Sequence, residues 1–180
     1  MSELSEIDKQ ERKEKVDRYK VLFDFYKSEY DSLRNEYYKV EDKASKYLTF
    51  LSVLSGAFLL LFKDSIERVE LNPLNILMLF LLTLLVITLS TSWRFIFMSI
   101  ATIELKNIPF NNENIEYFDK NYLDVFYYSM AKQYVEVIDS YKSAIKIKTD
   151  FLSKAFSEVK ITGLILLILL CVKFAVKVST

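Results

Sequence analysis

The sequence has no histidine, one cysteine, two glycines and two prolines in 180 residues. Without histidine, the chain offers no histidine general base and no histidine ligand for zinc. Gly56 and Gly163 each lie alone in apolar runs, so a glycine-rich phosphate loop is excluded. One cysteine cannot form an intrachain disulfide, and so few turn residues argue against an all-β fold. Twelve tyrosines, fourteen phenylalanines and a hydrophobic content of 52% remain, which favours a protein built from long helices.

The charged residues, 24 basic and 24 acidic, are absent from two long apolar runs and rare in a third. Tyr47–Phe62 and Leu71–Trp93 carry no charge, and Ile161–Val178 carries only Lys173 and Lys177 near its end. A helix that crosses a bilayer needs about 20 apolar residues, and lysines near its ends can reach the interface. We therefore predict an all-α membrane protein with two to three transmembrane helices and a long-helix cytoplasmic bundle.

The distribution of lysine and arginine predicts the orientation of these helices. Residues 1–46 carry eleven basic side chains and residues 94–160 carry nine, whereas Lys63–Asn75 carries two. Basic flanks face the cytoplasm, so we expect a cytoplasmic N-terminus and an external turn around Asn72 and Pro73. The predicted parts are a cytoplasmic N-terminal helix (1–46), a transmembrane hairpin (47–93), a cytoplasmic helical segment (94–160) and a third transmembrane or membrane-associated helix (161–180).

Two heptad-like seams run through the charged parts of the chain. The first alternates steps of four and three residues from Tyr19 to Leu54, and the second runs from Leu123 to Ala155. Packing within a helical bundle is the commoner explanation of such a seam, and a tyrosine-lined surface for a ligand or partner is the alternative. Lys148 interrupts the second seam; such a residue most often sets the register or snorkels, and less often contacts an anion. The residues we nominate for gating or for contact with a ligand or partner are Tyr26, Tyr30, Tyr37, Tyr134, Tyr141 and Lys148.

The connection between the hairpin and the second seam has a predicted geometry. Arg94–Asn107 should extend the second membrane helix, and Ile108–Asn114, with a proline and several polar residues, should form a loop. A straight helix over 117–160 would be about 66 Å long. The helical extension and an extended loop together would hardly span that distance. We therefore expect a break in this helix or a tilted bundle.

Small and hydroxylated residues lie in the first two membrane runs. Ser52 and Gly56 form a small-x-x-x-small pattern, which permits close approach of two helices. Helix packing is the default explanation of these residues, and a weakly polar pore lining shared by several subunits is the alternative. The candidates for either role are Thr49, Ser52, Ser55, Gly56, Thr88 and Ser92.

The sequence offers no catalytic constellation. Its carboxylates lie among lysines at helical spacing, as in Glu11 with Lys15, which is typical of solvated helix pairs. It has no nucleophile–base pair, no cofactor loop and no metal cage, and Cys171 lies in an apolar run. We therefore expect a protein that is not an enzyme and that binds no cofactor or metal.

The layout resembles that of the Pycsar-type transmembrane effectors and the related SLATT effectors of bacterial anti-phage defence. The resemblance rests on Asp42–Phe62, in which Asp-Lys-Ala-Ser leads into the first membrane run, and on Tyr134–Leu170, a basic helix that leads into the last. The long aromatic N-terminal helix departs from that pattern. The resemblance implies a homo-oligomer in the bacterial inner membrane and a cytoplasmic nucleotide-synthesising or sensing partner, or its nucleotide product, as the activating signal.

The leading hypothesis is accordingly a membrane effector that oligomerises and, on a nucleotide signal or release of a partner, forms a pore or disrupts the inner membrane to abort phage infection. The alternative is a membrane-anchored helical scaffold that recruits a cytoplasmic partner and conducts nothing. A holin-like phage protein fits less well because of the large cytoplasmic part.

Overall fold

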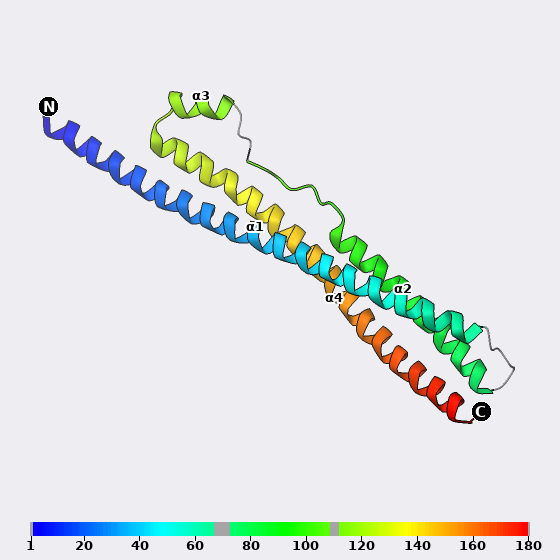
Figure 1. The fold of residues 1–180 in the computed structure, drawn as a ribbon. Helices are drawn as coiled ribbons and strands as arrows, with labels where there is room; N and C mark the ends of the chain where they lie inside the picture. The colour runs from blue at the N-terminus through cyan, green and yellow to red at the C-terminus, as the bar shows by residue number, and fades with distance from the viewer. Residues whose placement is uncertain (1, 67–72, 109–111, 180) are drawn as a thin grey trace. The chain divides into compact units, whose positions relative to one another are not determined.

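The computed structural model describes residues 2–66, 73–108 and 112–179, and within them four helices account for most of the chain. They are α1 (Ser2–Ile66), α2 (Pro73–Ile100), α3 (Asn112–Lys120) and α4 (Leu123–Ser179), as Figure 1 shows. The all-helical prediction is confirmed. α2 begins at Pro73, a residue whose missing N–H and fixed φ suit the first turn of a helix.

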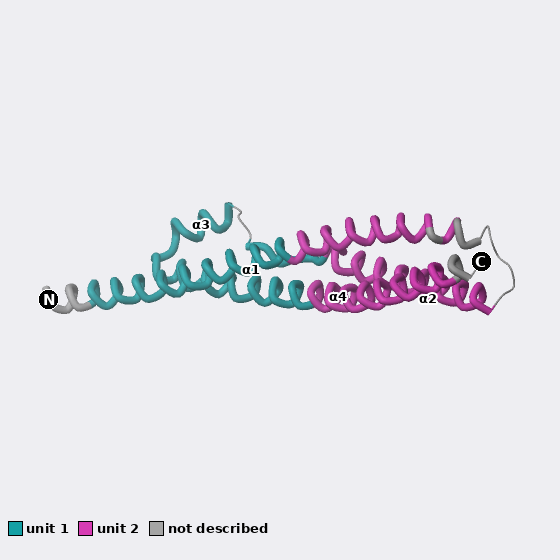
Figure 2. Tube along the Cα trace, turned by 60° about the horizontal axis from the view of Figure 1, so that its bottom comes forward, with its two compact units in different colours: residues 1–39, 103–146 teal, residues 40–102, 147–180 magenta. Residues whose placement is uncertain are grey.

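The chain divides into two compact units (Figure 2), and both long helices contribute to each of them. Unit 1 comprises residues 1–39 and 103–146, and unit 2 comprises residues 40–102 and 147–180. α1, a helix of 65 residues, contributes residues to both units.

Unit 1 is built on a parallel pair of helices, α1 and α4. Ring contacts advance in the same direction along both helices, from Tyr19–Tyr128 through Tyr30–Tyr134 to Tyr37–Tyr141. Except for Tyr128, these residues lie on the two seams that the sequence pattern predicts. α3 buries none of its side chains and meets α4 through the contact of Phe118 with Phe126, whose ring centroids are 4.8 Å apart.

Unit 2 is a three-helix bundle in which α2 runs antiparallel to α4. Thr91 contacts Glu158 and Ser99 contacts Lys148, so residue numbers fall along α4 as they rise along α2. Apolar side chains of all three helices form its core, namely Leu51, Phe58, Met78, Leu81, Leu82, Leu85, Leu89, Ile96, Ala155, Val159, Ile165 and Leu169.

The predicted extension of α2 to Asn107 is wrong. α2 ends at Ile100, and Thr102–Ile108 have no regular secondary structure. Within unit 1 this segment is held extended on α4, because the Lys106 N–H donates to Ser140 Oγ at 3.2 Å and the Lys106 ammonium pairs with Glu136 at 3.1 Å. Contacts with α4 therefore replace the helix that the local sequence permits.

The loop expected at Ile108–Asn114 is correct only at its start. Ile108 is non-helical, but α3 already begins at Asn112, and residues 109–111 lie outside the described part. The expected break in the 117–160 helix is confirmed: α3 ends at Lys120 and α4 begins at Leu123. Of the predicted external turn, residues 67–72 also lie outside the described part.

Two described helices are long and apolar enough to cross a membrane: α2 and the Leu123–Ala175 part of α4. They correspond to the second and third membrane runs of the sequence. The first run, Tyr47–Phe62, lies inside α1, which is not one of these two helices, so its assignment as a span stays a prediction.

Candidate functional site

The tyrosine seam of unit 1 is a continuous series of ring contacts between α1 and α4. Tyr30 lies between Tyr134 and Tyr141, with centroid distances of 5.6 and 5.5 Å, and it meets Tyr141 edge-on at 89°. Tyr37 contacts Tyr141 at 5.8 Å. These are the offset and edge-to-face geometries that aromatic pairs prefer. Nearer the N-terminus the series continues through the pairs Tyr19–Tyr128, Phe23–Tyr127 and Phe23–Tyr134.

Burial raises the pKa of two phenols in this seam. Tyr37, Tyr134 and Tyr141 are buried. Burial, followed by the hydrogen bond with Tyr30, raises the pKa of Tyr141 to about 12. Burial and the nearby charge of Asp31 also raise the pKa of Tyr134. The seam is thus a neutral, packed aromatic contact at physiological pH.

Four of the five nominated tyrosines therefore come together, and Tyr26 does not join their ring series. Tyr26 is half-buried and makes its ring contact with Phe25 of its own helix, at 5.6 Å. Packing between α1 and α4 accounts for the buried tyrosines. A role in gating or in contact with a ligand stays a prediction.

Lys148 joins all three helices of unit 2. Its side chain is 0% exposed, and its ammonium donates to Glu41 Oε1 of α1 at 3.0 Å and to the carbonyl oxygen of Ala101 at 3.2 Å. Ala101 directly follows α2, where the last carbonyls of the helix lack intrahelical donors. In return, the Ser99 hydroxyl of α2 donates to the backbone carbonyl oxygen of Lys148 at 3.2 Å. We call these four residues the Lys148 node.

The electrostatics of the Lys148 node explain why a lysine is tolerated in the seam. A buried ammonium is costly unless it is paired and hydrogen-bonded. Glu41 supplies the counter-charge, and the C-terminal end of α2 carries the partial negative charge of the helix dipole. Lys148 thus caps α2 and fixes its end against α1 and α4. The carboxylate that Lys148 contacts belongs to the same chain. Contact with an external anion stays a prediction.

The polar residues of the first membrane run lie on two sides of α1. Thr49, Ser52 and Gly56 are exposed, and the two hydroxyls donate to carbonyl oxygens one turn back in their own helix. No atom outside the helix lies within 4 Å of where a Cβ on Gly56 would be. Ser55 is different, because it faces the bundle and accepts a hydrogen bond from Trp93 Nε1 of α2 at 3.1 Å.

The nominated hydroxyls of α2 face the bundle rather than the outside. Ser92 is buried and Thr88 is half-buried, and both donate to carbonyl oxygens of their own helix. Next to them, Thr91 donates to Glu158 Oε2 of α4 at 3.3 Å. Thr162 lies one turn further along α4 and is also buried. The interior of the bundle is therefore polar on one side of α2.

Sequence reasoning missed Glu41, Ser99, Trp93 and Glu158. Glu41 could have been narrowed to one of two acids: if the two tyrosine seams are aligned in parallel with Tyr37 at Tyr141, Lys148 comes level with Ala44, and Glu41 and Asp42 lie within the preceding turn. No pattern marks Ser99, because its partner is a backbone carbonyl. Glu158 lies outside the uncharged runs and resembles the other helix-surface acids.

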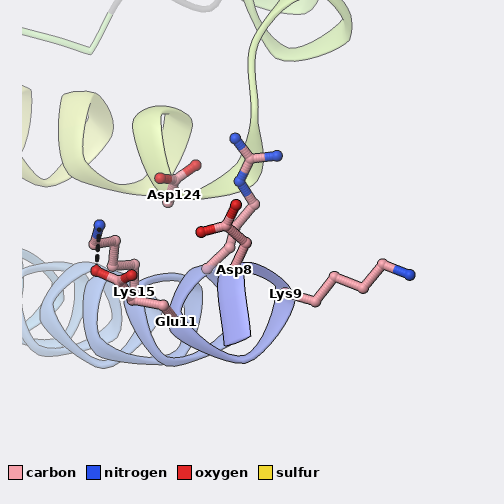
Figure 3. Close-up of a pocket in the computed structure, with 6 residues that line it drawn as sticks. Asp8, Lys9, Glu11, Lys15 and Asp124 are labelled. Atoms are coloured by element: carbon pink, nitrogen blue, oxygen red, sulfur yellow. Dashed lines mark ion pairs between the residues drawn. The ribbon is translucent and has the colours of Figure 1, made fainter. Parts of the chain in front are cut away.

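A polar hollow lies in unit 1 near the start of α4 (Figure 3). It is lined by Asp8, Lys9, Glu11, Arg12, Lys15 and Asp124. Figure 3 shows Lys9 pointing away from the other labelled residues and Lys15 paired with Glu11, at 3.2 Å. Three acids and three bases cancel, so this hollow has no net charge with which to select an ionic ligand.

Among the described residues, no group of three or more carboxylates or thiols is placed to hold a metal ion. A comparison with protein-family models, with curated proteins and with solved structures finds no match for this chain.

Proposed function

We propose that the chain is a membrane effector: unit 2 lies in the bilayer, several copies assemble through α1, and the assembly opens or disrupts the membrane when a signal acts on unit 1. By its resemblance to anti-phage effectors, the signal is a nucleotide or a partner protein in the cytoplasm of a bacterium, and the outcome is arrest of the infected cell. The N-terminus is cytoplasmic in this proposal, as the basic flanks predict.

The observation that carries the membrane assignment is the outer surface of unit 2. Its helices are apolar towards the core and also towards the outside, which is the pattern of a membrane bundle rather than of a water-soluble one. α2 has 28 residues and is therefore about 42 Å long, close to the full thickness of a bilayer with its headgroups. The outward apolar side chains include Phe50, Val53, Leu59, Leu60, Ile76, Phe80, Ile87, Phe97, Leu164, Leu167 and Phe174.

The assembly face that we propose is the exposed side of α1 at Thr49, Ser52 and Gly56. Because both hydroxyls already bond to carbonyls of their own helix, they can lie in an apolar environment without an unmet donor. The space around Gly56 lets the backbone of a second helix approach closely. In an assembled ring, the same small and weakly polar face would line the pathway or seal the contact between subunits.

Regulation in this proposal begins at the tyrosine seam. α1 is one helix from unit 1 through Gly56, so a signal that separates or rotates α1 against α4 acts on the helix that carries the assembly face. The Lys148 node holds the same helix through Glu41. Its geometry supports a role as the contact that keeps α1, α2 and α4 in the resting arrangement.

Substitution of Gly56 by leucine tests assembly and leakage together. Glycine costs about 1 kcal/mol in a helix interior, so Gly56→Leu should strengthen α1 itself while blocking close approach of a second copy. In vesicles, a Glu41→Leu background that removes the ion pair of the Lys148 node should form oligomers and release an entrapped ion indicator, and adding Gly56→Leu should abolish both. Ala57→Leu is the matched control, because Ala57 is exposed one residue further on and faces away from Ser52 and Gly56.

The scaffold alternative assigns partner recruitment to unit 1, whose α1 and α4 are held together by the tyrosine seam. It predicts no leakage from vesicles under any condition, function unaffected by Ser52→Leu, and loss of partner binding in Tyr30→Ala. Leakage that Gly56→Leu abolishes and Ala57→Leu preserves would exclude it. If neither variant changes a measurable leak, the α1 face is not the assembly surface.

A further inference from the structure

α2 has an outward hollow around its single charged residue. The hollow is lined by Ser90, Trp93, Arg94, Phe97 and Met98, and Arg94 is exposed in it. Its aromatic wall is fixed: the Trp93 indole donates to Ser55 Oγ, and its ring lies 5.3 Å from that of Phe97 at 33°. A guanidinium therefore stands beside a preformed aromatic surface.

Ser90 gives this hollow a second polar group. Within the described part of α2, Thr83, Thr88, Thr91, Ser92 and Ser99 each donate their hydroxyl to a carbonyl oxygen. Ser90 is the one hydroxyl of that described helix for which the structure shows no hydrogen bond, and it is exposed. Since it precedes Arg94 by four residues, the two side chains lie on the same face. The pair presents a hydroxyl and a guanidinium at one spot. Within the described part of the chain, no carboxylate forms an ion pair with Arg94.

An exposed apolar track runs along α2 from this spot. Ile87, Phe80 and Ile76 precede Ser90 at helical spacing and are each more than half exposed. The track leads from the polar spot at Arg94 into the uncharged middle of α2. A polar phosphate group and an attached hydrocarbon chain match this sequence of surfaces.

We propose that Arg94 and Ser90 bind the phosphate of an anionic phospholipid whose hydrocarbon chain lies against Ile87 and Phe80, with Trp93 and Phe97 beside the glycerol region. The proposal rests on the membrane position proposed above for unit 2. Arg94 lies near the end of α2, at the depth of the headgroups, where a guanidinium binds phosphate bidentately. An anionic lipid fits better than a zwitterionic one, because no carboxylate of the described residues pairs with Arg94 to neutralise it.

Trp93 makes the site directly observable, since it is the only tryptophan in the chain. The purified protein is reconstituted in phosphatidylcholine vesicles that contain a small fraction of phosphatidylglycerol with brominated chains, and quenching of tryptophan fluorescence reports contact. The converse vesicles carry the bromine on phosphatidylcholine. A basic residue near an anionic lipid surface is worth about 1 kcal/mol, which corresponds to roughly fivefold enrichment. We expect the fraction of phosphatidylglycerol beside Trp93, as obtained from the quenching, to exceed its fraction in the whole bilayer about fivefold.

The variants separate the site from general charge attraction. Arg94→Gln should reduce quenching to the bulk fraction, and Ser90→Ala should reduce the enrichment in part. Lys160→Gln removes one exposed positive charge from α4 and should leave the enrichment unchanged. Enrichment that survives Arg94→Gln, or that falls equally in Lys160→Gln, would overturn the proposal.

Two further outcomes are distinct. If neither brominated lipid quenches Trp93, unit 2 is not in the bilayer, and the proposed function itself fails. If phosphatidylglycerol quenches only at its bulk fraction in the wild-type protein, the membrane position stands and the lipid site is refuted. Loss of the enrichment on adding inorganic phosphate would assign the site to free phosphate instead of lipid.

Discussion

The two residues of the ion pair in the Lys148 node should differ in how much stability their substitution costs. Removing one partner of a buried ion pair costs about 3–5 kcal/mol, chiefly because the other charge stays buried. Glu41 is 38% exposed and Lys148 is 0% exposed, so solvent screens only one end of this pair. For Glu41→Leu, which leaves the buried ammonium without this counter-charge, we expect a loss of about 2–3 kcal/mol after allowing for screening.

Lys148→Met should cost less, although Lys148 is the more buried partner. It removes the buried charge itself, and Glu41 can then turn towards water. It also removes the hydrogen bond to the Ala101 carbonyl. Because Ala101 is exposed, water can replace the ammonium there, so this loss should be about 1 kcal/mol. The double variant should resemble Lys148→Met alone, because no charge then remains buried. The expected coupling energy between the two sites then equals the loss for Glu41→Leu, about 2–3 kcal/mol.

The assay is guanidinium unfolding of the purified protein in a mild detergent, followed by circular dichroism. Glu136→Leu is the control, since its pair with Lys106 has both side chains 65% exposed and should contribute less than about 1 kcal/mol. The reasoning is refuted if Glu41→Leu is no more destabilising than Lys148→Met, or if both lie within the range of the control.

Three further predictions concern the aromatic residues. The pKa of Tyr141 is raised to about 12 from an ordinary value near 10, so the folded state holds the phenolic proton more tightly than the unfolded state does. The stabilisation that this proton gives the folded state is complete below about pH 10 and is lost as the pH rises through 12. Circular dichroism against pH should show this loss, at most about 2–3 kcal/mol, and Tyr141→Phe should remove it; an unchanged profile in that variant contradicts the assignment. Ser55→Ala removes the acceptor of the Trp93 indole and should cost about 1 kcal/mol and shift the tryptophan emission, whereas unchanged emission would mean that the hydrogen bond is absent. Tyr30→Ala should destabilise the protein by about 2 kcal/mol or more through lost ring contacts, and Tyr38→Ala, at an exposed position, by clearly less; equal effects would show that the seam does not pack as described.

The helices and the two seams could be predicted from the sequence because their signal is local. Residues three and four apart share a helix face, so the aromatic series around Tyr30 and Tyr141 identifies the contact surfaces without any knowledge of the fold. The break before Leu123 was predictable from chain reach, but its position was not, since no proline or glycine marks it.

The end of α2 could not be predicted, because tertiary contacts determine it. Between Ile100 and Asn107 the sequence contains no glycine or proline to stop a helix. The stop comes from Lys148, which caps the Ala101 carbonyl, and from α4 residues that hold the Lys106 backbone in an extended conformation. Both contacts depend on the pairing of segments far apart in the sequence, which local helix propensity does not reflect. The same holds for the candidate site: Lys148 stands out in its seam, but its partners Glu41 and Ser99 are identified by the fold.

The claim on which the account depends is that the apolar surface of unit 2 lies in lipid, and the single cysteine tests it most directly. Cys171 is exposed on α4 in an apolar stretch. In sealed vesicles it should react with a membrane-impermeant maleimide at least about tenfold more slowly than the cysteine of a Lys132→Cys variant in a Cys171→Ala background, because Lys132 lies in unit 1 and is exposed to water. Both thiols should react fully once the vesicles are dissolved in a denaturing detergent. Equal reaction rates at the two positions in vesicles that carry the reagent on both sides would place this surface in water and contradict the account.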